Sequence, residues 1–286
     1  MDFNKYYEDR QKLVNTFLEK RLEKKGISRV DEAMAYSLLA GGKRIRPIIL
    51  MATADALGVS GYNFLPVACG LEMIHTYSLI HDDLPCMDDD EYRRGRLTNH
   101  KVFGEALALL AGDALLTLAF EVMLEQKNVP AEALIENVRE VAMCAGNFGM
   151  VGGQVIDLDS EGRQISEEEL RKLHAGKTGA LFIAAVRSGA RLSGAASDEL
   201  LALTKFADLL GLAFQITDDI LDVEGDAAQM GKAAHSDEKK HKSTYVTLYT
   251  LEGAKALAQK TVDEALGCLE MFGENAEALR EITKMM

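Results

Sequence analysis

Two clusters of aspartate residues constrain the fold of this chain more than any other feature of its sequence. The first is DDLPCMDDD at 82–90, the second is DDILD at 218–222, and each directly follows a mostly apolar stretch. Carboxylates crowded at the end of a buried helix repel one another and lose hydration, so their pKa values rise unless a cation neutralises them. Magnesium does this with oxygen ligands and bridges to phosphates. The clusters therefore predict the two acidic lips of a cleft that holds a phosphorylated substrate through magnesium ions.

The second cluster has the spacing of ligands on one helix face. Asp218 and Asp222 are four residues apart, and Asp219 lies beside them. A solvated acidic helix end is the alternative interpretation. That alternative is weakened because like charges at this spacing destabilise a helix, and because the preceding residues, LLGLAFQIT, are strongly apolar. A bound metal ion would offset the repulsion.

The first cluster contains a proline that changes its geometry. Asp82 and Asp88 are six residues apart, which places them on different sides of a regular helix. Pro85 disfavours helical geometry at the preceding residue and removes a backbone donor. The chain is therefore predicted to turn there and to bring Asp88 back toward Asp82.

Charge and cysteine content exclude several classes of protein. The formal net charge of −13 provides no basic excess for binding a nucleic acid. The four cysteines form no CxxC pair, which is typical of reduced cytosolic proteins, and the N-terminus lacks the pattern of a signal peptide. The longest apolar region is interrupted by Asp113 and Glu121, so it is predicted to be a core helix rather than a membrane span. We expect a cytoplasmic protein with no integral membrane segment.

Helix is the predicted structure of nearly the whole chain. Only four prolines occur, while Ala, Leu, Glu and Met abound. No stretch alternates polar and apolar residues long enough for a strand, so no sheet is expected. Residues 157–165 and 224–242 are predicted loops, and one all-α domain is expected to span 1–286. The predicted helices are 3–25, 30–41, 45–57, 63–82, 102–126, 131–153, 167–174, 177–191, 198–223, 244–269 and 275–285.

The basic residues of this acidic chain come in short clusters. Two clusters adjoin the aspartate motifs and the third follows a Gly-Gly helix break; they are Lys43, Arg44 and Arg46; Arg93, Arg94 and Arg96; and Lys232, Lys239, Lys240 and Lys242. Scattered surface cations are the alternative interpretation. Arginine binds phosphate through two parallel hydrogen bonds, whereas lysine acts as a point charge. Metal ions together with so many basic side chains predict that the cleft binds more than one diphosphate group.

These segments occur in an order that resembles a known family. GGKRIRP, EMIHTYSLIHDDLPCMDDDEYRRGR, LAGDALLTLAFE, GGQVIDL, KTGALF, FQITDDILD and KST follow one another as in the trans-isoprenyl diphosphate synthases, and the likeness runs from about residue 20 to 251. The chain is most similar to the bacterial short-chain enzymes that make farnesyl diphosphate. The resemblance implies an all-α helical bundle around a deep central cavity, usually assembled as a homodimer.

The resemblance also implies roles for individual residues. Three magnesium ions are expected, two held by Asp82 and Asp88 and a third by Asp218 with Asp222 near it. Asp83 is also expected among the metal-binding residues, and Asp219 fits the second motif. The residues implied for the allylic diphosphate are Arg93, Lys177, Lys232 and Lys242. Those implied for isopentenyl diphosphate, bound without metal, are Lys43, Arg46, His75 and Arg94. Thr178 and Gln215 are expected beside the developing cation. A hydrogen-bonded core histidine is the alternative for His75.

The implied reaction explains this inventory of residues. Magnesium and cations stabilise the departing diphosphate, so an allylic carbocation forms in a cavity without nucleophilic water. The double bond of isopentenyl diphosphate attacks it and a proton leaves; the resemblance implies that the departing diphosphate takes this proton. Dimethylallyl and then geranyl diphosphate would be extended in this way, mainly to farnesyl diphosphate.

Product length is expected to depend on Tyr77 and Ser78. Tyr77 lies five residues before Asp82, about 7.5 Å along a helix axis. A phenol ring there is predicted to block a longer chain, and ordinary core packing is the alternative for Tyr77. A geranylgeranyl diphosphate synthase is the main alternative function. A class I terpene cyclase and a non-catalytic synthase subunit are disfavoured by the intact GGKRIRP and aspartate motifs, and no EF-hand spacing supports an acidic calcium-binding module.

Overall fold

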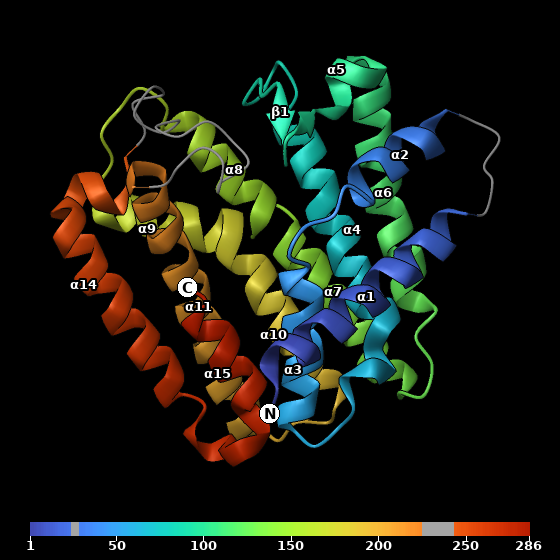
Figure 1. Ribbon diagram of the computed structural model, residues 1–286, viewed down its shortest axis with the longest axis vertical. Helices are drawn as coiled ribbons and strands as arrows, with labels where there is room; N and C mark the ends of the chain where they lie inside the picture. The colour runs from blue at the N-terminus through green and yellow to red at the C-terminus, as the bar shows by residue number, and fades with distance from the viewer. Residues whose placement is uncertain (24–28, 225–242) are drawn as a thin grey trace.

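The computed structural model describes residues 1–23, 29–224 and 243–286 of a protein that is helical almost throughout (Figure 1). The all-α prediction is therefore confirmed. The elements are α1 (Phe3–Leu22), α2 (Val30–Leu38), α3 (Ile45–Ala56), the 3-10 helix η1 (Gly61–Phe64), α4 (Leu65–Asp82), β1 (Tyr92–Arg93), β2 (Arg96–Leu97), α5 (Asn99–Phe103), α6 (Glu105–Leu124), α7 (Ala131–Ala145), α8 (Met150–Asp159), α9 (Glu167–His174), the π-helix η2 (Ala175–Gly179), α10 (Ala180–Leu192), α11 (Ser197–Glu224), α14 (Tyr245–Gly267), the 3-10 helix η3 (Glu270–Ala276) and α15 (Glu277–Lys284).

Helix α4 lies at the centre of the bundle and carries the first aspartate cluster at its C-terminal end. It lies beside α6 (Figure 1) and packs against α3, α6 and α10. Most of its side chains are buried. Helix α11 carries the second cluster and packs against α10 and α14. The two acidic ends are thus held by helices whose positions are fixed by extensive apolar packing.

The prediction that the chain contains no sheet was wrong. A two-residue antiparallel hairpin pairs Tyr92 with Leu97 and Arg93 with Arg96. Its turn residues, Arg94 and Gly95, both have positive φ angles of 54° and 72°, as a tight hairpin of this hand requires. The strands are too short to produce an alternating pattern in the sequence. The hairpin matters because it carries Arg93 and Arg94.

Several predicted helix boundaries also differ from the structure. The helix predicted over 102–126 is divided at Gly104 into α5 and α6. The helix predicted over 131–153 is divided into α7 and α8, and α8 continues to Asp159, into the predicted loop. The helix predicted over 177–191 begins earlier, in the π-helix η2. These differences place Asp157 and Lys177 on helical elements that pack together.

The turn before α3 is anchored to α4 by a buried ion pair. Gly41, Gly42 and Arg44 all have positive φ, so the chain reverses sharply there. The Arg44 guanidinium, 2% exposed, donates through Nη1 to Oε1 of Glu72 at 2.8 Å and through Nη2 to the Leu38 carbonyl at 2.7 Å. Arg44 is therefore bound within the fold, and the turn is held in register with the central helix.

This anchor yields a stability prediction. Glu72→Gln keeps the side-chain volume but leaves the buried Arg44 charge without its counter-charge. We expect it to lower the free energy of unfolding by about 3 kcal/mol, the scale for removing one partner of a buried pair. Urea unfolding followed by circular dichroism measures the change. The matched control is Glu168→Gln, whose exposed pair with Lys172 lies on one helix; no measurable change is expected there. Equal stabilities for the two variants would contradict the anchor.

Candidate active site

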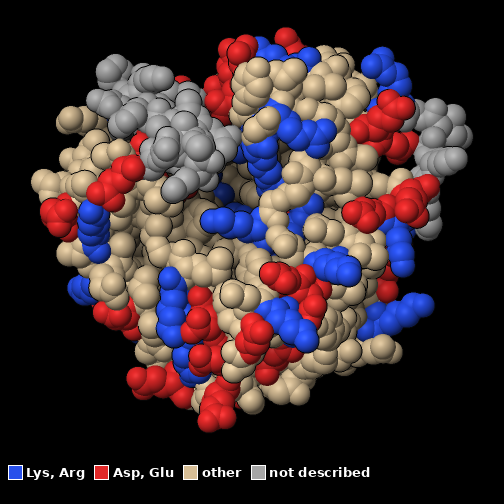
Figure 2. Space-filling model, viewed as in Figure 1, with Lys and Arg blue, Asp and Glu red and all other residues tan. Residues whose placement is uncertain are grey.

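A cleft of about 540 Å³ lies between the first aspartate cluster and the second. Its walls come from α3, α4, the hairpin, α8, η2 and α11. Figure 2 shows Lys and Arg side chains gathered in the hollow of this face. The cleft brings together eleven of the residues singled out in the sequence: Lys43, Arg46, His75, Asp82, Asp88, Arg93, Arg94, Lys177, Thr178, Gln215 and Asp218. Lys232 and Lys242 lie outside the described residues.

The first acidic lip has the turn that Pro85 predicts. The backbone N–H of Asp88 donates to the carbonyl of Asp82 at 2.8 Å, which brings the two residues together at the cleft. Burial raises the pKa of the Asp82 carboxyl to about 6; Lys177 opposes this rise and Asp88 adds to it. The crowding of the two carboxylates, together with the raised pKa of Asp82, makes a site that favours an additional cation.

The three aspartates of the second lip lie in different surroundings. Asp218 lines the cleft, whereas Asp222 is 3% exposed and is not part of the described cleft wall. Asp219 also borders the cleft, but its Oδ2 accepts a 2.7 Å hydrogen bond from the backbone N–H of Tyr245 at the start of α14. Asp219 thereby joins α11 to the chain that follows the predicted loop.

Two of the basic residues at the cleft have carboxylate partners. Arg93 Nη2 lies 2.6 Å from Oδ1 of Asp83, and Lys177 Nζ lies 2.6 Å from Oδ2 of Asp157. Asp157 was missed as a site residue by the sequence analysis, although it belongs to the GGQVIDL segment. Its signal was weak because a single acid in a predicted loop has no obvious partner.

The Lys177 backbone is held by very close packing between α8 and η2. A Cβ atom at Gly153 would lie 2.0 Å from the backbone nitrogen of Lys177, and none could be accommodated without moving the two helices apart. The glycine therefore lets α8 approach until Asp157 reaches the Lys177 ammonium. The π-helical geometry of η2, which is frequent at functional sites, places Thr178 on the same cleft wall.

Arg46, Arg94 and Lys43 also line the cleft but, unlike Arg44, have no carboxylate partner among the described residues. Arg46 is 7% exposed, and its guanidinium lies 5.1 Å above the Phe182 ring. Arg94 donates to the Gly41 carbonyl, while Lys43 is exposed at the rim. Burial lowers the pKa of Arg46 to about 10, so it stays protonated at neutral pH. A buried guanidinium without a carboxylate is costly, and a bound anion would compensate it.

His75 lies between these cations and the apolar interior. Burial, reinforced by the charges of Arg46 and Arg94, holds the pKa of His75 well below its usual value. The imidazole is therefore neutral and can donate one hydrogen bond and accept another. It borders both the cleft and a second cavity.

That second cavity is mostly apolar and measures about 320 Å³. Tyr77 and Ser78 line it, together with side chains from α8 such as Val151 and Val155. The Tyr77 ring is 6% exposed and packs edge-on against His81 with ring centroids 5.6 Å apart. Asp82, Lys177 and Thr178 border this cavity as well as the cleft. A ligand whose polar head lies in the cleft can therefore place an apolar tail in this cavity.

The donor set fits a divalent metal ion that is shared with a ligand. Among the described residues, no three acidic, histidine or cysteine side chains converge tightly enough to hold a metal by themselves. Asp82 and Asp88 offer hard oxygen atoms on one lip and Asp218 offers them on the other. Magnesium is usually bound by one or two carboxylates, with waters and substrate phosphates completing its shell. Such an arrangement defines an enzyme that acts on molecules with a phosphorylated head and a hydrocarbon tail.

Comparisons with known proteins agree with this class. The polyprenyl synthetase family matches residues 27–286. A farnesyl diphosphate synthase of Geobacillus stearothermophilus is 47% identical, covering 100% of this chain and 97% of its own. A geranylgeranyl diphosphate synthase of Cyanophora paradoxa is 46% identical, covering 91% and 87%. The solved apo structure of an FPP/GFPP synthase from Zymomonas mobilis is similar with a TM-score of 0.90, at 37% identity and 99% and 98% coverage.

The chain belongs to the polyprenyl synthetase family. It is a prenyltransferase, of a family that uses isoprenoid diphosphates and generally depends on a divalent metal. The likeness to bacterial short-chain enzymes inferred from the motifs is thereby confirmed. The comparisons do not assign roles to single residues, and these roles are argued from the geometry of the cleft.

Proposed function

We propose that this enzyme condenses dimethylallyl and then geranyl diphosphate with isopentenyl diphosphate, head to tail, to give mainly farnesyl diphosphate. The observation that carries the proposal is the division of basic residues in one cleft. Arg93 and Lys177 have carboxylate partners and adjoin the aspartate lips, whereas Arg46 and Arg94 have none among the described residues. Two diphosphates, one bound with metal and one without, match these two environments.

The allylic diphosphate is assigned to the side with the aspartates. Asp82 and Asp88 would hold two magnesium ions and Asp218 a third, with Asp222 supporting it from behind. Magnesium, when bound, neutralises the negative charge that develops on the departing diphosphate. Arg93 and Lys177 donate hydrogen bonds to the same oxygens, and Lys232 and Lys242 are proposed to add to them. The carbon–oxygen bond breaks and its electron pair stays on the diphosphate.

Isopentenyl diphosphate is assigned to the other side. Arg46 and Arg94 donate to its oxygens, Lys43 adds charge at the rim, and neutral His75 donates one hydrogen bond. Thr178 and Gln215 line the cleft, and their side-chain oxygens would face the allylic carbon, where positive charge develops. The double bond of isopentenyl diphosphate attacks that carbon, and the proton lost from the adduct passes to the departed diphosphate. The apolar cavity excludes water from the cation.

Metal dependence is the first consequence. Asp82→Asn and Asp218→Asn should each lower turnover by about 10²–10³-fold, because electrostatic stabilisation of the leaving group is lost. Chelation by EDTA should abolish turnover, and added Mg²⁺ should restore it. Product formation from geranyl and isopentenyl diphosphates measures the effect, with folding checked by circular dichroism. Asp89→Asn is the matched control, since Asp89 is exposed and does not line the cleft. Near-normal turnover by folded Asp82→Asn would contradict the assignment of Asp82 to the metal site.

The division of the cations predicts which kinetic constant each variant changes. Arg46→Ala should raise the KM for isopentenyl diphosphate by about 10–100-fold, the scale of lost charge-assisted hydrogen bonds. It should leave the KM for geranyl diphosphate nearly unchanged. Lys177→Ala should do the reverse and also lower kcat. Initial rates with one substrate saturating and the other varied separate these effects. If both variants weaken both substrates equally, the two-sided cleft is incorrect.

Product length is proposed to be set by Tyr77, which closes the apolar cavity against His81. Tyr77→Ala removes a ring that a further isoprene unit would clash with, because packed interiors tolerate little added volume. The main product should shift from farnesyl to geranylgeranyl diphosphate, as measured by mass spectrometry of the products. Tyr62→Ala, at a half-exposed tyrosine remote from the cavity, is the control. An unchanged product distribution in active Tyr77→Ala would show that Tyr77 does not limit the length of the product.

We propose that the enzyme acts as a homodimer in the cytoplasm, joined through the outer face of α6, α7 and α8. Helix α6 is long and apolar enough to cross a membrane, yet only 39% of its apolar window is buried. Apolar side chains exposed on these helices and on the turn between α7 and α8 are Leu109, Leu110, Leu124, Ile135, Met143, Phe148, Val151 and Val155. Because Val151 and Val155 also line the apolar cavity, a second copy on this face would help to exclude water from it.

The dimer is tested by light scattering after size exclusion. Wild type should have twice the chain mass of 31.3 kDa, and Phe148→Glu, at a side chain that is 86% exposed, should be monomeric because an interface cannot bury its charge unpaired. Leu201→Glu, at an exposed leucine on α11, is the control and should remain dimeric. A monomeric wild type would exclude the dimer, and wild type that sediments with lipid vesicles would assign the face to a membrane instead.

A further inference from the structure

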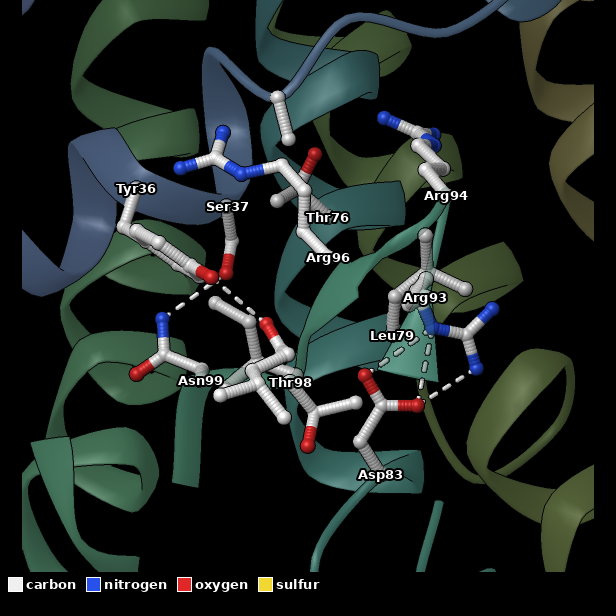
Figure 3. Close-up of a pocket in the computed structure, with 13 residues that line it drawn as sticks. Tyr36, Ser37, Thr76, Leu79, Asp83, Arg93, Arg94, Arg96, Thr98 and Asn99 are labelled. Atoms are coloured by element: carbon white, nitrogen blue, oxygen red, sulfur yellow. Dashed lines mark hydrogen bonds and ion pairs between the residues drawn. The ribbon is translucent and has the colours of Figure 1, made fainter. Parts of the chain in front are cut away.

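The two adjacent aspartates of the first motif face different spaces. Asp82 ends α4 and lines the cleft, whereas Asp83 lies outside the described cleft wall. Asp83 instead borders a small pocket formed by α2, α4 and the hairpin, where it is 3% exposed (Figure 3). Successive residues of a helix point about 100° apart, so the two carboxylates cannot serve one metal without a change in the backbone.

The Asp83 carboxylate is bound by Arg93 of the hairpin. Arg93 donates from Nε to Oδ1 at 2.8 Å and to Oδ2 at 3.0 Å, and from Nη2 to Oδ1 at 2.6 Å (Figure 3). Burial alone would lower the pKa of the Arg93 guanidinium, but these hydrogen bonds raise that pKa above its usual value. Both carboxylate oxygens are therefore engaged by one guanidinium, in the geometry of a strong charge-assisted pair.

Arg93 is the residue through which this pair reaches the cleft. Arg93 borders both the small pocket and the cleft. The hydrogen bonds described for its side chain to Asp83 use Nε and Nη2. The third nitrogen, Nη1, makes none of these bonds. The hairpin has only two residue pairs, so the ion pair to α4 is a main constraint on where the guanidinium points.

We propose that Asp83 is a positioning residue that aims Arg93 at the allylic diphosphate and is not a metal ligand. The proposal rests on the function proposed above and reassigns one of its motif residues. If Asp83 turned to a metal, the partly buried Arg93 guanidinium would lose its nearest counter-charge and keep only the more distant Asp90, whose Oδ2 lies 3.8 Å from Nη2; removing the close partner of a partly buried charge is unfavourable. The metal-bearing lip then consists of Asp82 and Asp88, and Asp83 acts on the reaction only through Arg93.

The test separates metal binding from substrate binding. Binding of Mn²⁺, added as a paramagnetic substitute for Mg²⁺, is measured by electron paramagnetic resonance in the presence of inorganic diphosphate and without turnover. Asp83→Asn should bind as many Mn²⁺ ions as wild type, while Asp82→Asn should bind fewer. In steady-state kinetics, Asp83→Asn should raise the KM for geranyl diphosphate by about tenfold, as expected when a charge-assisted hydrogen bond is lost. The KM for isopentenyl diphosphate should change less than about twofold.

A double-mutant cycle distinguishes positioning from a general loss of structure. If Asp83 acts through Arg93, then Asp83→Asn should have almost no further effect on the geranyl diphosphate KM in an Arg93→Ala background. Effects that multiply independently would contradict the proposal. If Asp83→Asn does not fold, Arg93→Lys is the alternative variant, because lysine keeps the charge but cannot span both carboxylate oxygens. Arg93→Lys should raise the KM for geranyl diphosphate and leave Mn²⁺ binding intact.

The outcomes also distinguish this proposal from the proposed function. Loss of Mn²⁺ in Asp83→Asn, to the same extent as in Asp82→Asn, would make Asp83 a ligand and overturn the positioning role alone. Unchanged Mn²⁺ binding in Asp82→Asn would instead overturn the metal assignment on which the proposed function rests. A geranyl diphosphate KM equal to that of wild type in Asp83→Asn would show that Arg93 needs no partner to point into the cleft.

Discussion

The matching of charges inside the cleft is the constraint on which the rest of the site depends. Arg93 and Lys177 each lie 2.6 Å from a carboxylate, so their charges are largely balanced before any ligand binds. Arg46 has no carboxylate partner among the described residues, although it is almost fully buried. One side of the cleft therefore has an excess of positive charge, and the other side carries the carboxylates of Asp82 and Asp88. A diphosphate can bind the first directly and the second only with cations.

The helical bundle maintains this difference through its packing. Helix α4 holds both Asp82 and Glu72, so the acidic lip and the anchor of the turn before α3 share one rigid element. Close contact at Gly153 brings α8 against η2 and sets the Asp157–Lys177 pair. The apolar cavity that Tyr77 lines opens between the same elements, so the fold also fixes where Tyr77 lies relative to the cleft. Charge placement and the proposed control of product length thus depend on the same helices.

The sequence predicts the scaffold and most of the cleft, but not the direction of individual side chains. Helix content followed from composition, and the return of Asp88 to Asp82 followed from Pro85. The two-residue hairpin was missed because a period of two needs longer strands to be visible. Asp83 was grouped with Asp82 because adjacent acids in one motif look equivalent until the end of α4 is seen. Asp157 was missed because its partner is 20 residues away.

Binding of each substrate alone, with and without divalent metal, tests the two-sided cleft most directly. Calorimetric titrations of isopentenyl diphosphate and of geranyl diphosphate into the protein would be compared in EDTA and in Mg²⁺, where neither substrate alone gives the condensation product. The account predicts that isopentenyl diphosphate binds in EDTA with an affinity close to that in Mg²⁺, whereas geranyl diphosphate binds only with Mg²⁺. If both substrates require Mg²⁺, or if both bind equally well in EDTA, the cleft does not divide the diphosphates as its charges indicate.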